Sequence, residues 1–227
     1  MRNIVFPERL VIVEARKLIG ESLLALFLKT NVFPSIIVAH DCSELNFQTE
    51  WSGLTVFLIA GSSYLRIRQT VISLQTLQTD STIVILDEHF RCGGGLLVRE
   101  TNVHGYWTFQ DTAEIIVEGI IEAVNRRRSI SPLLGKHLNH SAQNRLQLSS
   151  DLKEHPLYKL SKRERQLFYL ISSGRKMEAC ATEMGIAKKT VSNLREKLMK
   201  KFGVKSGTDL VWKAVETGLI GPFAAFE

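Results

Sequence analysis

The sequence contains little cysteine and no hydrophobic run long enough to cross a membrane. Its three cysteines, Cys42, Cys92 and Cys180, are an odd number without CxxC spacing, so neither a disulfide framework nor a zinc knuckle is indicated. No apolar stretch approaches the roughly 18–20 residues of a membrane span, and the start, Met1-Arg2-Asn3-Ile4, does not resemble a signal peptide. These absences predict a soluble, cytoplasmic protein with no membrane association.

Two patterns that could suggest a bound ligand carry too little information to do so. The histidines His137, His140 and His155 lack the supporting residues that accompany metal-bound imidazoles, so we expect them to be solvated. The run Gly93-Gly94-Gly95 lacks the spacing and the lysine of a phosphate-binding loop, and we interpret it as a flexible loop. The sequence therefore predicts neither a metal nor a cofactor.

Charge is divided unevenly between the two halves of the chain. Residues 1–125 hold 9 Lys and Arg against 14 Asp and Glu, whereas residues 126–227 hold 20 against 9. This asymmetry predicts that only the second half faces a polyanion. Lysine and arginine there would neutralise phosphates and release counterions, which makes affinity fall steeply with salt. A solvated, lysine-rich helix surface is the alternative interpretation.

The length of 227 residues and the 44% apolar content are sufficient for two modest cores. We predict a first domain over residues 1–125, a linker over 126–158 and a second domain over 159–227. The linker begins with the basic run 126–128 and continues with polar sequence rich in Ser and Asn, which favours a domain boundary and relative motion.

The first domain alternates short apolar strands with helical patterns. Five such strands separated by helices predict an α/β fold, a flavodoxin-like wound sheet of five parallel strands covered on both faces. Any active crevice would lie at the carboxyl ends of the strands. The predicted strands are 10–13, 35–39, 54–59, 82–86 and 106–109.

The second domain contains several short helices in one basic block, residues 160–220, and is predicted to be all-α. Ser161 and Glu164 have the spacing of a capping box at the start of the first helix, and Gly174 is a helix stop. Residues 177–202 have the pattern of a helix-turn-helix, with the turn at Gly185 and Cys180 packed inward.

The second helix of this motif has one apolar and one polar face. Val191, Leu194, Leu198 and Phe202 recur at helical spacing and should face the core. The opposite face should meet the major groove, with Asn193 reading adenine, Glu196 accepting from cytosine and lysines reaching guanine or phosphate. These outward residues are Lys189, Asn193, Glu196 and Lys200, flanked by Ser192 and Lys197. Nearby, Lys188, Arg175 and Lys176 are placed for backbone phosphates.

The chain resembles a LuxR-type response regulator of the NarL/FixJ class. The residues that carry the resemblance are Leu160-Ser161, Arg163-Glu164, Gly174, Thr190-Val191, Lys201-Phe202-Gly203-Val204 and Gly218-Leu219-Ile220. The first domain is similar in its predicted topology, supported by Gly105-Tyr106 and by Ser131-Pro132. The resemblance implies a receiver domain followed by a domain that binds double-stranded DNA.

The first domain departs from the pattern that the family requires for phosphorylation. The resemblance implies an acidic pair after the first strand for Mg²⁺, an Asp at the end of the third, a Thr or Ser after the fourth and a Lys after the fifth. Here the corresponding positions hold Glu14-Ala15, Ile59-Ala60-Gly61, Asp87 and Phe109. We therefore expect a pseudo-receiver without a phosphoacceptor, in which Phe109 fills the former pocket by packing. Asp87 is either a displaced acidic group or a turn residue.

Two departures affect the DNA-binding half. Ala187 replaces the Ser or Thr that usually caps the recognition helix, a loss of about 0.5–2 kcal/mol unless another group substitutes. Ser192 and Leu194 stand where many relatives have Lys and His, so the preferred DNA sequence should differ.

Three hypotheses of function follow. The first is a sequence-specific transcriptional regulator, a homodimer with a seam at Val211, Ala214 and Val215, whose pseudo-receiver binds a protein partner or a small effector. The second is a protein-interaction adaptor that pairs with and titrates another regulator. The third is an enzyme or nucleotide-binding protein that uses the wound sheet, and we expect the chain not to be an enzyme.

Overall fold

The computed structural model describes residues 4–45, 54–61, 64–77, 81–125, 127–140 and 146–220. The chain divides into two compact units, with the main boundary between Ser149 and Ser150. None of the helices in these ranges is both long and apolar enough to cross a membrane. Arg126, the first residue of the predicted linker, and the predicted ends of the domains at residues 1 and 227 lie outside the described residues.

The amino-terminal unit is built on a parallel sheet of six strands in the order β2-β1-β3-β4-β5-β6. Strands and α-helices alternate from β3 to β6, as crossover connections between parallel strands require, whereas the described residues between β2 and β3 form only a short 3₁₀ helix. The elements are β1 (Arg9–Val13), α1 (Lys17–Leu28), β2 (Ser35–Ala39), β3 (Thr55–Gly61), α2 (Tyr64–Leu77), β4 (Thr82–Asp87), α3 (Cys92–Glu100), β5 (Gly105–Thr108), α4 (Ala113–Val124) and β6 (Ser129–Ile130). A short 3₁₀ helix spans Cys42–Glu44. The flavodoxin-like fold class is confirmed.

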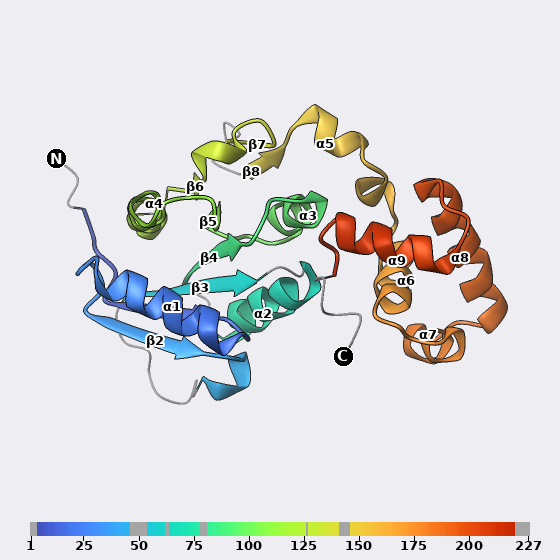
Figure 1. The fold of residues 1–227 in the computed structure, drawn as a ribbon, viewed down its shortest axis with the longest axis horizontal. Helices are drawn as coiled ribbons and strands as arrows, with labels where there is room; N and C mark the ends of the chain where they lie inside the picture. The colour runs from blue at the N-terminus through green and yellow to red at the C-terminus, as the bar shows by residue number, and fades with distance from the viewer. Residues whose placement is uncertain are drawn as a thin grey trace. The chain divides into compact units, whose positions relative to one another are not determined.

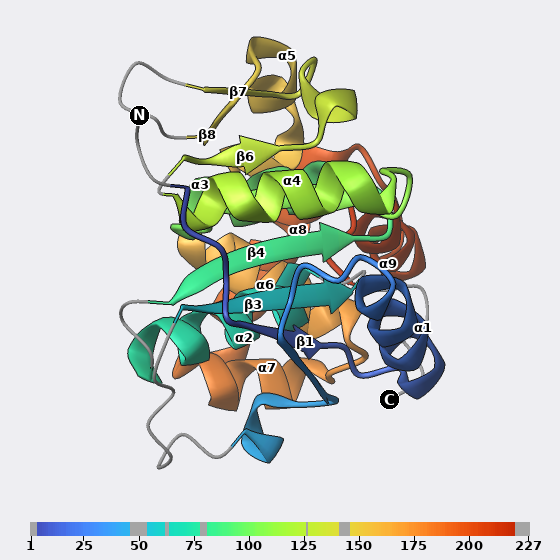
Figure 2. The ribbon, with the colours of Figure 1, turned by 90° about the vertical axis from the view of Figure 1, so that its left-hand side faces the viewer.

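Helices cover both faces of this sheet. Figure 2 shows α1 and α4 on the near face, and Figure 1 shows α2 and α3 on the opposite side. Alternate strand residues such as Leu10, Ile12 and Trp107 form one buried cluster with α1 and α4. The indole of Trp107 packs so closely against α4 that a Cβ added at Gly119 would lie 2.1 Å from the ring. Close packing of this kind orients the strands and therefore the loops at their carboxyl ends.

The structure differs from the sequence prediction in two elements of this unit. The run Gly93-Gly94-Gly95 lies in helix α3, so the interpretation as a flexible loop is wrong. Leu96 and Leu97 are completely buried, and this tertiary packing outweighs the low helix propensity of glycine. The sheet also has a sixth strand, β6, which pairs with β5 over only two residues and is too short to leave a periodic signal.

The segment that joins the two units also contains regular structure. A two-stranded antiparallel sheet, β7 (Leu138–His140) with β8 (Leu146–Leu148), precedes helix α5 (Ser150–Glu154). Two 3₁₀ helices span Pro132–Leu134 and Pro156–Lys159. The imidazole of His137 stacks on Phe90 with ring centroids 5.1 Å apart, and His155 caps the second 3₁₀ helix by accepting from the amide of Leu157.

The carboxyl-terminal unit is a helical domain made of α6 (Lys162–Ser172), α7 (Met177–Met184), α8 (Lys188–Phe202) and α9 (Gly207–Glu216). The capping box of Ser161 and Glu164 at the start of α6 is confirmed. Gly174 and Gly185 have φ values of +77° and +62°, a backbone conformation that glycine adopts without strain, and each follows the end of a helix. The predicted helix-turn-helix is therefore α7, the turn at Gly185 and α8.

Candidate functional site

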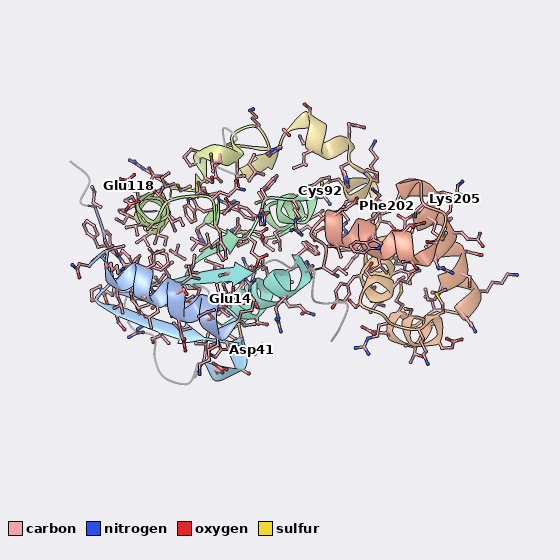
Figure 3. All side chains as sticks on the ribbon, in the orientation of Figure 1. Glu14, Asp41, Cys92, Glu118, Phe202 and Lys205 are labelled. Atoms are coloured by element: carbon pink, nitrogen blue, oxygen red, sulfur yellow. The ribbon has the colours of Figure 1, made fainter. Side chains whose placement is uncertain are left out.

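Helix α8 has the orientation that its sequence pattern predicts. Val191 and Leu198 are completely buried, and Leu194 and Phe202 are half-buried. The ring of Phe202, labelled in Figure 3, lies 4.7 Å from the ring of Phe168 on α6, centroid to centroid. Cys180 of α7 is also buried. The apolar stripe thus faces the core of the domain and leaves the opposite face of α8 in solvent.

The exposed side of the helix-turn-helix holds the residues that the sequence predicts for DNA contacts. Ser192 is half-buried, and its hydroxyl donates to the carbonyl of Lys188. The other predicted residues are exposed, namely Arg175, Lys176, Lys188, Lys189, Asn193, Glu196, Lys197 and Lys200. Two of them, Arg175 and Lys176, lie just before α7 and the rest on α8. The residues on α8 thus lie on the exposed part of the helix, away from the buried Val191 and Leu198.

One of these cations has a partner within the protein. The ammonium group of Lys188 forms an ion pair with the carboxylate of Glu178 in the first turn of α7. Hydrogen bonding to Lys188 lowers the pKa of Glu178, so this carboxylate is ionised at neutral pH. Ala187 at the start of α8 makes no side-chain capping bond, as its sequence predicts. A phosphate bound at Lys188 would therefore compete with Glu178.

A second ion pair fixes α8 to the start of α6. The carboxylate of Glu164 accepts from the Ser161 amide and from the ammonium group of Lys201, each at 2.8 Å. The Glu164 side chain is only 8% exposed. Burial opposes its ionisation, but the hydrogen bonds from Lys201 and Ser161 outweigh that effect and lower the pKa of Glu164. This pair connects the capping box of α6 to the last turn of α8, and so helps to set how α8 is presented.

Charge is arranged differently at the carboxyl ends of the strands in the amino-terminal unit. Glu14, labelled in Figure 3, follows β1, and its side chain is 2% exposed. Its Oε1 accepts from the backbone amide and from Nε of Arg16, both at 2.9 Å, and its Oε2 accepts from the guanidinium at 2.8 Å. The same guanidinium binds Glu88, which follows β4. Hydrogen bonding to Glu14 raises the pKa of Arg16, which is therefore a permanent cation.

The other carboxylates at this edge also have partners within the protein. Asp87 is the last residue of β4 and is buried, and its Oδ2 accepts from the hydroxyl of Tyr106 at 2.5 Å. The interpretation of Asp87 as a turn residue is therefore wrong, because the strand extends through it. Asp111 accepts from the Thr108 amide at 2.8 Å and from the Ser131 hydroxyl at 2.6 Å.

Phe109 does not fill a pocket at this edge. Phe109 lies one residue beyond the end of β5, and 38% of it is exposed. The prediction that its side chain fills the former phosphorylation pocket by packing is therefore wrong. The side chain that stands between the carboxylates is instead Arg16. Strand β3, which lies between β1 and β4 in the sheet, ends with Ala60 and Gly61, neither of which has a side-chain oxygen.

The ion pairs of these two regions were not predicted from the sequence, among them Arg16–Glu88 and Lys188–Glu178. The first joins residues 72 positions apart, across a strand that lies between them in the sheet. The second crosses the turn of the helix-turn-helix. The sequence signal for the first was a charged residue within three positions of the end of each strand, a pattern common in loops. The predicted seam residue Ala214 is buried, so it cannot contribute to a dimer contact in this conformation.

Comparison with known proteins places the helix-turn-helix in a family. Residues 158–214 match the family described as bacterial regulatory proteins, luxR family. The response regulator UvrY of Escherichia coli (strain K12) is 23% identical over 140 residues, a match that spans 62% of this chain and 62% of UvrY. The chain thus matches less than two thirds of the length of that relative.

Two solved structures resemble the chain over nearly its whole length. RcsB from Salmonella enterica serovar Typhimurium, bound to the promoter rprA in the presence of the phosphomimetic BeF3⁻, has a TM-score of 0.59 at 15% identity and covers 90% of this chain and 96% of that one. A structure of two RcsB dimers bound to two parallel DNAs has a TM-score of 0.52 at 12% identity and covers 92% of this chain and 98% of that one. At these identities the likeness shows the fold alone. Residues 158–214 form a LuxR-family helix-turn-helix domain, and the chain as a whole is similar in fold to response regulators.

Proposed function

We propose that this chain is a sequence-specific, DNA-binding transcriptional regulator. The observation that carries the proposal is the orientation of α8 within a LuxR-family domain. Its apolar stripe is buried, and Lys189, Asn193 and Lys200 are exposed on the opposite face. A helix presented in this way can enter the major groove, where an amide side chain reads adenine and lysines reach guanine or phosphate oxygens.

We further propose that the receiver-like unit works without an aspartyl phosphate. An acyl phosphate needs an acceptor carboxylate, and β3 ends with Ile59, Ala60 and Gly61. The carboxylates nearby are held by Arg16, Tyr106, Thr108 and Ser131. The unit would act by dimerisation or by binding a protein partner or an effector, and the proposal assigns no catalytic reaction to the chain. A homodimer suits this function because each domain reads one half-site, and the RcsB structure described with dimers on DNA supports that arrangement.

Genome-wide selection of DNA bound by the purified full-length protein tests this function. We expect a shared sequence motif to emerge. Asn193→Ala should relax the preference at one base position, because this side chain reads a base edge. Lys188→Ala should instead weaken binding to all duplexes and reduce the salt slope by about one, because this side chain meets phosphate. A selection that recovers no sequence over random duplex, or two variants with identical effects, would contradict the proposal.

A protein-interaction adaptor is the second candidate, and one observation favours it. Trp212 on α9 is 64% exposed, and a large aromatic side chain in solvent is typical of protein contact surfaces. If the full-length chain fails to bind any duplex yet forms a stable complex with a purified DNA-binding regulator, and Trp212→Ala abolishes that complex, the adaptor function replaces the first.

A further inference from the structure

A receiver-like fold would place a divalent cation at the carboxyl edge of the sheet in the amino-terminal unit. The resemblance to receiver domains implies Mg²⁺ there, and such a hard cation needs several oxygen ligands at one point. The described residues do not fit this requirement. Of the carboxylates at the edge, Glu14 is bound through both oxygens by Arg16, Asp87 accepts from Tyr106 and Asp111 accepts from Thr108 and Ser131.

The side chain of Arg16 lies between the carboxylates of Glu14 and Glu88. Glu14 follows β1 and Glu88 follows β4, and the guanidinium of Arg16 binds both. The Glu14 side chain is 2% exposed and that of Glu88 is 19% exposed, so neither is well solvated. Two poorly solvated carboxylates at one point repel each other and need a cation nearby. Arginine suits this position because its planar group presents several donors and stays charged.

We propose that Arg16 is a built-in counter-ion that takes the role of a divalent cation and fixes the loop after β1 to the loop after β4. The edge is then held in one arrangement without metal or phosphoryl group, which extends the proposed phosphorylation-independent function. The inference concerns this unit alone. If the chain binds DNA as proposed but fails the following test, only the inference about Arg16 is overturned.

Thermal unfolding of the full-length protein with and without 10 mM MgCl₂, at matched ionic strength, tests the inference. The wild type should melt at the same temperature in both buffers. Arg16→Met should lower Tm by about 5–10 °C because it leaves two carboxylates without a counter-ion. Mg²⁺ should restore part of that loss. Lys17→Met, which removes the neighbouring and 79% exposed cation, is the matched control and should change Tm little.

A second variant separates the electrostatic role from simple packing. Adding Glu88→Gln to Arg16→Met removes one of the two repelling charges, so the double variant should melt above Arg16→Met and should no longer respond to Mg²⁺. If Arg16→Met does not fold, Arg16→Lys replaces it, since a lysine keeps the charge but cannot bridge both carboxylates with a planar fork. Its Tm should be intermediate, and Glu88→Gln should raise it.

Three results would overturn the proposal. One is a wild-type Tm that rises with Mg²⁺ as much as that of the variant. Another is a reduced Tm in Arg16→Met that neither Mg²⁺ nor Glu88→Gln recovers. The third is an Arg16→Met or Arg16→Lys protein that melts like the wild type.

Discussion

The carboxyl edge of the sheet and the exposed face of α8 are both rich in charge, and they deal with it in opposite ways. At the sheet edge, Glu14 and Glu88 are both paired with Arg16. On α8, Lys189, Lys197 and Lys200 are exposed and form no ion pair with any residue that the structure describes. Charges paired within a unit hold its loops together, whereas cations left in solvent can attract a polyanion. The difference supports the proposal that the first region stabilises the fold and the second binds DNA.

Reversing charge on α8 should have the largest effect and tests the second half of the comparison. We expect Lys189→Glu with Lys200→Glu to lower affinity for the selected duplex by about 100-fold or more, because two attractive contacts become repulsive. Fluorescence anisotropy with labelled duplex measures the change. The control, Lys17→Glu with Lys29→Glu on exposed positions of the other unit, changes net charge equally and should cost less than about threefold. Equal losses in the two double variants would show that only net charge matters.

Removing the buried pair beneath α8 should have an intermediate effect that depends on pH. The pKa of Glu164 lies below its ordinary value of 4.5, so its contribution to stability is fully present above that value and is lost as pH falls through the lowered pKa. Glu164→Gln should therefore lower the free energy of unfolding by about 1–3 kcal/mol at pH 7 and by progressively less in acid. Urea unfolding of the full chain at several pH values measures this. A difference that stays constant from pH 7 to strong acid would show that Glu164 acts by packing alone.

Freeing Lys188 should have the smallest effect, because among the cations predicted to contact DNA it forms an ion pair with another described residue, Glu178. Glu178→Gln removes the carboxylate that competes with phosphate, so DNA affinity should rise by about two- to fivefold. The control is Glu154→Gln, which breaks the exposed pair with Lys159 outside the helix-turn-helix and changes net charge equally. Anisotropy titrations of both variants, with and without Lys188→Ala, test whether Glu178 competes with DNA phosphate for Lys188. An equal gain in DNA affinity in the two variants, or a gain that persists after Lys188→Ala, would show that Glu178 does not compete with phosphate for Lys188.

Sequence patterns predicted the two regions unequally well, for a physical reason. The orientation of α8 follows from the spacing of Val191 and Leu198 along one helix, so local periodicity was sufficient. The bridge from Arg16 to Glu88 depends on which strands lie side by side, and no local pattern encodes it. The helix over Gly93-Gly94-Gly95 was missed because burial of Leu96 and Leu97 outweighs local propensity. Asp87 and Phe109 were assigned the wrong environments because the exact ends of β4 and β5 are not set by composition.

Amide NMR spectra of the deuterated full-length protein, recorded while its selected duplex is added, distinguish DNA contact by α8 from a response at the sheet edge. We expect the largest chemical-shift changes on residues 188–200 and on Arg175 and Lys176. The signals of Glu14, Arg16 and Glu88 should stay in place when Mg²⁺ and acetyl phosphate are then added. Shift changes centred on the sheet edge with none along residues 188–200, or a new set of signals at Glu14 and Glu88 after the phosphoryl donor is added, would contradict these expectations.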